Sequence, residues 1–586
     1  MSKRAGLIVA MLVVASLVLG ACSTPAPQVI EKEVEKIVKE TVVVEKEVEK
    51  VVEKVVEVEK AEDTTPKGTA VVGVWQEPKG LIWNIFYDAH ANDIVASMYY
   101  TPVTTDENDQ LVPQMLEELP TLENGGVSAD GRTITVKFKP GFAWHDGVPV
   151  TAEDYKFTWE FIMDPATVSQ TTAGWNMIEN IEVTDELTAV VTLTESYVPF
   201  VASTLVFPIL PKHALEGVAD PGNSEFARAP LGNGPFVFQE WIPGDRIVVK
   251  ANPDAPIPPK IEEIIFKFVP DMNTLLALLR TGDVDVAYDL RETQIADIVK
   301  MQNVEVIALP GLGIERYYFN LRDPKDLTQP HPIFSDINVR KALMMGMDRW
   351  SAVSGILQGY GEVAITELDN HPWANTDLEP VPYDPEAAAA LLDQAGWVVG
   401  SDGIRAKDGV RLSFRHSTTA GNQVRENLQL LFQQNLKDIG VEMIIDNYQS
   451  ATFFGGCATD GIFGTSNFDV MGFTNRPASI DLAQEWSDFF LTSALKDCET
   501  NPAGSNAWGY SNPTLDEQMA CALNELDSAK RVECIKAAQE TIYNDYFTLY
   551  VYDRLDVFAV SDRVKGVNPT IFGGHTYSYT DWQVVE

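Results

Sequence analysis

The composition of the chain changes abruptly near residue 65, and this boundary confines any globular fold to the residues that follow it. Residues 29–60 are a low-complexity repeat of Val, Glu and Lys, in which apolar residues recur at alternating spacings of four and three. This heptad pattern, interrupted at Thr41, predicts either a helical stalk able to self-associate or a disordered charged tether. A turn-forming segment at 64–68 then marks the start of the folded region.

Residues 1–22 have the features of an export signal. Lys3 and Arg4 precede an apolar run over residues 7–19, which is too short to span a membrane comfortably. The run ends in Leu19-Gly20-Ala21-Cys22, which resembles the lipobox of bacterial lipoproteins. This resemblance implies that Cys22 is acylated on its thiol and becomes the mature N-terminus, so that lipid anchors the protein at a membrane. An ordinary cleaved signal and an uncleaved anchor are the alternatives.

The region after the boundary is too long for one hydrophobic core, so we expect two or three domains. Residues 71–75 form a short apolar run, and residues 134–138 alternate apolar with polar side chains, as half-buried strands do. Residues 151–154 have the pattern of a capping box, and Asp384 precedes a second helix that Gly396 ends. Interleaved strands and helices predict an α/β fold of several domains.

Charge and missing motifs exclude several classes of function. The net charge of −41 argues against nucleic acid as a partner, because no basic stripe offsets the acidic surface. The chain lacks Gly-x-Ser-x-Gly, His-Glu-x-x-His and phosphate-loop motifs, and its seven histidines are scattered. Asp106-Glu107-Asn108 fits a turn better than a calcium loop. We therefore expect no catalytic residues, metal site or cofactor, although two distant carboxylates could still make a hydrolase.

Six longer stretches carry a more specific pattern. They are Ser128–Arg132, Lys139–Asp154 with Trp144-His145-Asp146-Gly147 inside it, Leu231–Phe236, Tyr318–Asn320, Asn338–Leu343 and Met347–Arg349. Together they resemble family 5 of the extracellular solute-binding proteins, which contains oligopeptide-, dipeptide-, nickel- and some oligosaccharide-binding components of ABC importers. The resemblance spans nearly all of residues 69–586. Most of these residues are expected to be scaffold, with Arg340 and Arg349 tying a helix to carboxylates or helix-end carbonyls.

The resemblance implies a periplasmic-binding-protein-like clamshell of type II, with two lobes and an extra inserted domain. Lobe I would comprise residues 65–98, 193–312 and 553–586, the inserted domain residues 99–192, and lobe III residues 313–552. The signal peptide (1–22) and the stalk or tether (23–64) would precede them. The chain would then cross between lobes near residues 311–315 and 552–556, and ligand in the cleft would favour closure.

In the peptide binders of this family, ligand contacts come from the segment matching residues 90–93 and from the end of a strand, here residues 468–473. In those binders an acidic residue takes the peptide's amino terminus. The matching position in this chain is about Arg476, and an arginine would instead suit a carboxylate or hydroxyl-rich ligand. Alternatively, Arg476 points away and pairs with Asp481 or Glu485. Asp481 or Asp488 could replace the missing acid.

Aromatic side chains near these segments could stack on sugars or pack on peptide side chains, although each could equally belong to the core. The predicted ligand-binding residues are Trp75, His90, Asn92, Tyr317, Phe473, Thr474, Asn475, Arg476, Trp486 and Trp508. A peptide is the first expectation for the ligand and an oligosaccharide the second. The expected partners are ABC permease subunits with their ATPases. An anchored hydrolase and a receptor without transport function are the rivals from other classes.

Four cysteines follow the signal segment, and an even number in an exported protein favours disulfides. Cys521 and Cys534 lie almost equally far from a turn between two helical patterns, so an antiparallel helix pair would bring them together. Cys457 would then pair with Cys498. Four free thiols are the alternative, and zinc is disfavoured because no Cys-x-x-Cys or nearby His supports it.

The lipobox reading predicts that Cys22→Ser releases the protein from the membrane or leaves its signal segment unprocessed, because the acyl chains have no thiol to attach to. Detergent partitioning and the mass of the N-terminus measure both effects. A variant that partitions and is processed like the wild type would contradict lipid anchoring at Cys22.

Overall fold

The computed structural model describes residues 65–86, 89–476, 481 and 483–585. The predicted signal peptide, the stalk and Cys22 lie outside these residues and stay predictions. The described residues belong to one compact unit, and the predicted start of the folded region near residue 65 stays a prediction. Among the described residues, no helix combines the length and the apolar character that a membrane crossing requires.

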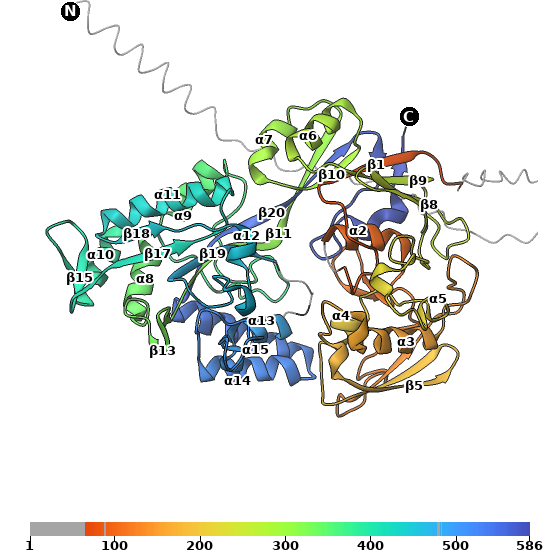
Figure 1. The fold of residues 1–586 in the computed structure, drawn as a ribbon, viewed down its shortest axis with the longest axis horizontal. Coiled ribbons are helices and arrows are strands. Elements are labelled where there is room, and N and C mark those ends of the chain that lie inside the picture. Colours follow the sequence, from red (N-terminus) through yellow and green to blue (C-terminus); the bar gives the residue numbers. More distant parts are fainter. Residues whose placement is uncertain (1–64, 87–88, 477–480, 482, 586) are drawn as a thin grey trace, which may run out of the picture. The chain divides into compact units, whose positions relative to one another are not determined.

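A ten-stranded mixed sheet dominates the fold (Figure 1). In spatial order its strands are β18 (Glu442–Ile445), β17 (Ser413–Ser417), β19 (Val470–Asn475), β11 (Val304–Phe319), β20 (Thr548–Ser561), β10 (Val286–Leu290), β1 (Thr69–Val74), β9 (Glu263–Phe268), β8 (Arg246–Ala251) and β7 (Phe236–Ile242). The two longest strands, β11 and β20, lie side by side near its middle and pair antiparallel. They connect the strands drawn from residues 413–475 with those drawn from residues 69–290.

The pairing of β11 with β20 is irregular at two places, between Pro310 and Ile314 and between Glu315 and Arg316. The register runs from Val304 opposite Ser561 to Pro310 opposite Leu555, and resumes with Ile314 opposite Asp553. Three residues, 311–313, therefore face a single residue, Arg554, which is a bulge. A Cβ on Gly311 would lie 2.9 Å from the Arg554 carbonyl oxygen, so glycine permits this close approach. The bulge falls where the sequence predicts the crossings between lobes; the lobe boundaries themselves stay a prediction.

A separate antiparallel sheet lies within the segment proposed as the inserted domain. Its order is β4 (Thr133–Lys137), β6 (Thr188–Leu193) and β5 (Ile178–Asp185), and α3 (Ala152–Met163) packs against β5 and β6. Smaller strand groups are β2 (Val103–Thr105) with β3 (Leu111–Pro113), β12 (Arg322–Asp323) with β13 (Asp326–Pro330), β14 (Val398–Val399) with β15 (Arg405–Lys407) and β16 (Val410–Arg411), and β21 (Val564–Lys565) with β22 (Gln583–Val584).

Further α-helices flank the sheets in the described part of the chain. They are α2 (Ala89–Met98), α4 (Phe200–Thr204), α5 (Lys212–Leu215), α6 (Met272–Thr281), α7 (Ile295–Ile298), α8 (Ile337–Gly346), α9 (Arg349–Ser351), α10 (Pro385–Gln394), α11 (Gln423–Asp438), α12 (Ser450–Phe453), α13 (Ala483–Phe490), α14 (Pro513–Asn524) and α15 (Ser528–Asp545).

Local signals in the sequence explain where two of these helices begin and end. The Asp154 carboxylate accepts a hydrogen bond from the Thr151 backbone N–H at 2.9 Å, so the predicted capping box starts α3. Asp384 accepts from the Ala387 N–H at 2.9 Å and starts α10. That helix stops just before Gly396, whose φ of +87° suits a residue without Cβ. Both predicted helices are confirmed.

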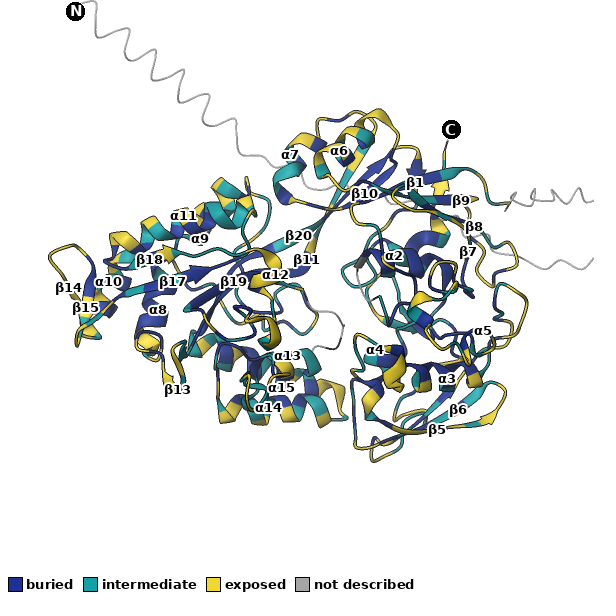
Figure 2. Cartoon of the chain, viewed as in Figure 1, coloured by how far each residue is buried: buried dark blue, intermediate teal, exposed yellow. Residues whose placement is uncertain are grey.

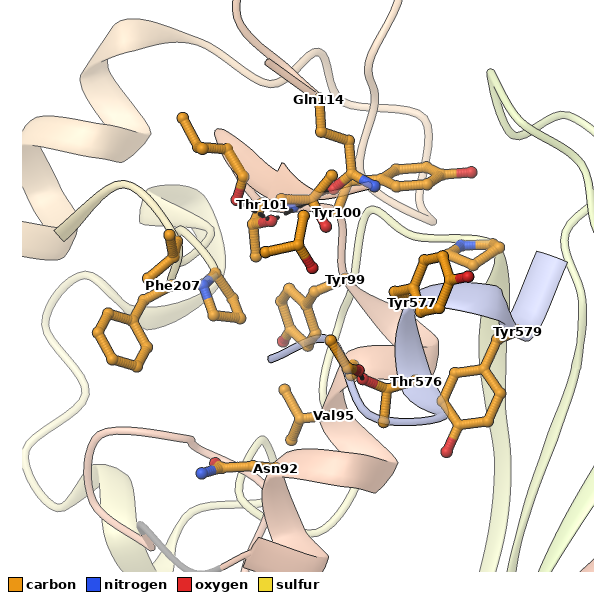
Figure 3. A pocket seen from close by; sticks show the side chains of 18 of the residues that line it. Asn92, Val95, Tyr99, Tyr100, Thr101, Gln114, Phe207, Thr576, Tyr577 and Tyr579 are labelled. Atoms are coloured by element: carbon orange, nitrogen blue, oxygen red, sulfur yellow. Dashed lines mark hydrogen bonds between the residues drawn. The ribbon is translucent and has the colours of Figure 1, made fainter. Parts of the chain in front are cut away.

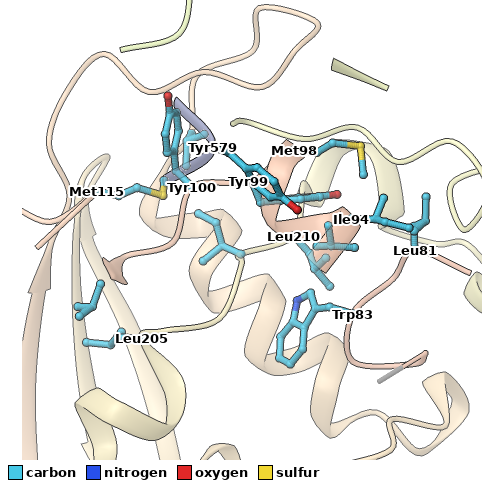
Figure 4. Close-up of a cluster of buried hydrophobic side chains, with 14 of the residues drawn as sticks. Leu81, Trp83, Ile94, Met98, Tyr99, Tyr100, Met115, Leu205, Leu210 and Tyr579 are labelled. Atoms are coloured by element: carbon cyan, nitrogen blue, oxygen red, sulfur yellow. The ribbon is translucent and has the colours of Figure 1, made fainter. Parts of the chain in front are cut away.

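The buried apolar side chains form separate cores, and Figure 2 shows which parts of the chain are buried. One core joins the proposed lobe I with the inserted segment, and Figure 4 shows the part of it around Trp83, Tyr99 and Leu210. Two others lie within residues 314–552. Tyr317 belongs to one and its neighbour Tyr318 to the other, because successive side chains of a strand point to opposite faces. The sheet is therefore covered on both faces along this stretch of β11.

Two buried arginines hold the elements around α8 together through carbonyl groups; the helix-end carbonyl predicted as a partner is found for Arg340, whereas the carbonyls that Arg349 binds lie outside helices. Arg340 donates from Nε and Nη2 to the Asp545 carbonyl at the end of α15. Arg349 donates to the carbonyl oxygens of Ala364, Tyr550 and Val381. A fixed guanidinium fork can satisfy several carbonyls at once, which is why arginine rather than lysine suits these positions.

The cysteines lie in the two pairs expected from the sequence. Cys457 and Cys498 have Cα atoms 5.5 Å apart, and Cys521 and Cys534, on the adjacent helices α14 and α15, are 6.0 Å apart. The sulfurs of each pair lie at bonding distance. The links would close loops of 41 and 13 residues, which corresponds to about 4 and about 3 kcal/mol of stabilisation through lost entropy of the unfolded chain.

Candidate functional site

An aromatic-lined cavity of about 430 Å³ lies where four stretches of the chain meet (Figure 3). Helix α2 supplies Asn92 and Asp93, the segment between α2 and β2 supplies Tyr99, and the loop after α4 supplies Phe207. The carboxyl-terminal segment 572–580 supplies Tyr577, among others. Aromatic rings and threonine hydroxyls therefore form most of the wall, which suits a ligand with both apolar and polar groups.

Hydrogen bonds hold the carboxyl-terminal wall of this cavity in place. The Asp109 carboxylate, in the turn between β2 and β3, accepts from the backbone N–H groups of Ile571 at 3.0 Å and Phe572 at 2.8 Å. That turn is itself closed by Asp106, which accepts from the Asn108 and Gln110 N–H groups, as the sequence predicts for this segment. The wall at 572–580 is therefore fixed by a residue far away in the sequence.

Two glycines in the Leu231–Phe236 stretch let the backbone of that stretch lie directly against the end of α2. A Cβ on Gly232 would lie 2.1 Å from the Met98 carbonyl oxygen, and one on Gly234 would lie 2.4 Å from the Tyr99 nitrogen. Only glycine leaves room for this backbone contact. The stretch therefore positions the end of α2 and the Tyr99 ring, as expected for scaffold.

Two of the predicted residues near α2 lie beside the cavity rather than in its wall. His90 is buried, and its Nδ1 is 3.1 Å from the Tyr288 hydroxyl. Trp75 packs edge-on against His90 and donates from Nε1 to Asp289 at 3.1 Å. Of the residues predicted in this region, Asn92 is the one that lines the cavity.

Four of the aromatic residues predicted to contact ligand are packed in cores, and their contact with ligand stays a prediction. Tyr317 is 2% exposed and packs on the His416 ring. Trp508 stacks on Tyr318 with ring centroids 3.8 Å apart and donates its indole N–H to a carbonyl. Phe473 and Trp486 are buried in the same core. Packing on both faces of the sheet encloses these rings.

The polar residues at the end of β19 are engaged with side chains of the protein. Thr474 donates to Glu315, which also binds the Arg425 guanidinium at 2.9 and 3.1 Å. Asn475 donates to Glu485 at 2.9 Å. Both side chains therefore help to fix this end of the strand.

Arg476 lies next to the β11–β20 crossing and pairs there with a carboxylate. It is half-exposed and donates from Nη1 to Asp556 at 2.7 Å, so the expected pairing with Asp481 or Glu485 is wrong. Asp481 is instead buried against the guanidinium of Arg531, and its predicted role as a substitute for the ligand-binding acid stays untested. The predicted contact between Arg476 and ligand stays untested.

A carboxylate pair is buried on the same crossing. Burial first, and then the charges of Asp369 and Glu362, raise the pKa of Asp553 to about 9. Asp369 accepts from the Ile365 and Thr366 N–H groups, which favour its charged form. We therefore assign the shared proton to Asp553 at neutral pH. In the described part of the chain, no three His, Cys, Asp or Glu side chains are grouped to hold a metal ion.

Comparisons with known proteins place this geometry in a family. The sequence profile described as "Bacterial extracellular solute-binding proteins, family 5 Middle" matches residues 110–480. The oligopeptide-binding protein AppA of Bacillus subtilis (strain 168) is 32% identical over 514 residues, which covers 85% of this chain and 88% of the relative.

Solved structures agree on the fold. AppA of Bacillus subtilis in complex with a nonapeptide aligns with a TM-score of 0.69 at 26% identity, over 89% of this chain and all of that chain. NikZ of Campylobacter jejuni in complex with Ni(L-His) aligns with a TM-score of 0.72 at 23% identity, again over 89% and 100%. The described residues therefore have the two-lobed α/β fold of periplasmic binding proteins.

The buried carboxylate pair predicts how stability depends on pH. A carboxyl whose pKa is raised by folding stabilises the protein below its unfolded pKa, and this contribution is lost as pH rises through the folded pKa. For Asp553 the window runs from about pH 4 to about pH 9. Asp553→Asn keeps a donor for Asp369 without a titrating group, so its free energy of unfolding should fall less between pH 5 and pH 8 than that of the wild type.

Urea denaturation at the two pH values measures this difference, which is at most about 1.4 kcal/mol per pH unit. Asp562→Asn, an exposed aspartate just after β20, is the matched control and should follow the wild type. Parallel pH dependence of Asp553→Asn and the wild type would refute the assignment of the proton.

Proposed function

Because the chain belongs to family 5 of the bacterial extracellular solute-binding proteins, we propose that it is the substrate-binding component of an ABC importer. In this role it captures a peptide outside the cytoplasm and delivers it to membrane permease subunits that work with ATPases. Binding and release are sufficient for this task, so no covalent chemistry is assigned to the chain.

The aromatic cavity is the observation that carries the proposal. Its wall combines rings such as Tyr99, Phe207 and Tyr577 with hydroxyl and amide groups, the composition of a site that binds a small amphipathic molecule. A peptide is favoured because the relative AppA is described as oligopeptide-binding and its solved structure holds a nonapeptide. An oligosaccharide is the second candidate, because the same tyrosine and tryptophan rings can stack on sugar faces.

Ligand capture would be coupled to movement of the lobes. Phe572 lines the cavity and its ring also lies edge-on to His371, 5.4 Å between centroids, in the segment proposed as lobe III. The bulge at residues 311–313 gives the paired strands a place to bend. A ligand held by both lobes would stabilise the closed arrangement, because only that arrangement completes its contacts.

The amino-terminal segments would connect this binding unit to the membrane. Acylation of Cys22 would hold the protein on the outer face of the cytoplasmic membrane or in the periplasm. The heptad segment would then act as a spacer, with self-association through its apolar seam. Both parts of this proposal rest on the sequence alone.

The direct test of the proposed function is to identify what the purified protein carries. Mass spectrometry of the small molecules released on denaturation should find peptides, and calorimetric titration should show that they rebind. Tyr577→Ala should weaken rebinding about tenfold or more, as for loss of an aromatic contact in a binding site.

Tyr383→Ala is the control, since Tyr383 is a partly buried tyrosine outside the cavity. Release of an oligosaccharide would replace peptide by the second candidate. Equal weakening by Tyr577→Ala and Tyr383→Ala would remove the cavity from the proposal.

A further inference from the structure

The charged side chains that line the cavity narrow the class of ligand more than the shape of the cavity does. Asp93 is the one aspartate, glutamate, lysine, arginine or histidine among the described residues that line the cavity. It lies on α2, beside Asn92 and three residues before Ala96, which also lines the cavity. A cavity with one carboxylate and no cationic side chain is suited to a positive group rather than to a second anion.

Acidic side chains near the cavity add to its negative charge. The pKa of Tyr577 is raised by burial and then by the nearby charges of Glu107, Asp581, Asp109 and Asp106. Lys260 pairs with Asp581 at 2.8 Å and offsets one of these charges. The Asp106 and Asp109 carboxylates accept backbone N–H groups, which does not neutralise them.

Aromatic rings provide the second element of cation recognition. Tyr99, Tyr577 and Phe207 line the cavity from different segments (Figure 3). The negative face of an aromatic ring attracts an ammonium or guanidinium group, and the attraction is stronger where water is excluded. Rings and carboxylate together would replace the water that a cation gives up on entering.

We propose that this cavity binds the cationic group of the ligand, with Asp93 as its counter-charge and the surrounding rings as its apolar wall. The inference rests on the proposed function, since it specifies which peptides that site would select. It also assigns the anion to lobe I, whereas the position expected to hold an acid in lobe III is Arg476, paired with Asp556. The cation is an alkylammonium or guanidinium, either the amino terminus of a peptide or a basic side chain.

Titration calorimetry with four synthetic peptides distinguishes these sources. They are N-acetyl-trilysine amide, trialanine amide with a free amine, N-acetyl-trialanine amide without charge, and N-acetyl-triglutamate amide. At least one of the two cationic peptides should bind about tenfold or more tightly than the neutral one, and the glutamate peptide should bind most weakly. Which cationic peptide gains shows whether the terminus or the side chain enters the cavity.

Asp93→Asn should remove this advantage, a loss of about tenfold or more, as for a charge-assisted hydrogen bond. The neutral peptide should keep its affinity for the variant, which shows that the site is still folded. Asp408→Asn is the control, because this exposed aspartate lies in the turn between β15 and β16, and asparagine also tolerates its φ of +51°.

Two results would overturn the inference. The first is equal affinity for the lysine and glutamate peptides, and the second is a cationic advantage that survives Asp93→Asn. In either case the peptides still bind, so the proposed capture of peptides stands. Failure of all four peptides to bind would instead contradict peptide capture itself, and the inference with it.

Discussion

The antiparallel pairing of β11 with β20 is the interaction on which the rest of the structure depends. Backbone hydrogen bonds along these two strands connect the strands of residues 413–475 with those of residues 69–290, and their register shifts at residues 311–313 and again between Glu315 and Arg316. Ion pairs surround these shifts, from Glu292 to Arg554 and from Arg476 to Asp556. A stiff ladder whose two irregular points both lie within residues 310–316 concentrates bending there, which is what a two-lobed binding protein requires.

The candidate site is built on this scaffold from segments that are far apart in the sequence. Gly232 and Gly234 let their backbone lie directly against the end of α2. The Asp109 carboxylate fixes the carboxyl-terminal wall through hydrogen bonds from backbone N–H groups. The cavity thus combines rigid backbone with side chains of one charge sign. Such a site can select ligands by charge and shape while the larger movement of the lobes supplies capture, so that recognition and delivery are served by different parts of the fold.

Local sequence signals predicted the elements well, whereas burial of the aromatic residues depended on packing that no local pattern reveals. Asp154 and Asp384 cap the helices expected of them, and the equal spacing of Cys521 and Cys534 from a turn predicted their proximity. The burial of Tyr317 and Trp508 was not predicted, because aromatic rings in a core and in a cleft have the same sequence pattern. The wall at residues 572–580 was missed, since its contacts with Asp109 are long-range.

Small-angle scattering tests the central claim, that ligand closes two lobes about the β11–β20 crossing. Residues 65–586 without the amino-terminal segment would be measured free and then saturated with the ligand identified from the purified protein. The account predicts a smaller radius of gyration in the saturated sample, and a return to the larger value when the ligand is removed. An unchanged scattering profile at saturation, with binding verified by calorimetry, would contradict the clamshell mechanism.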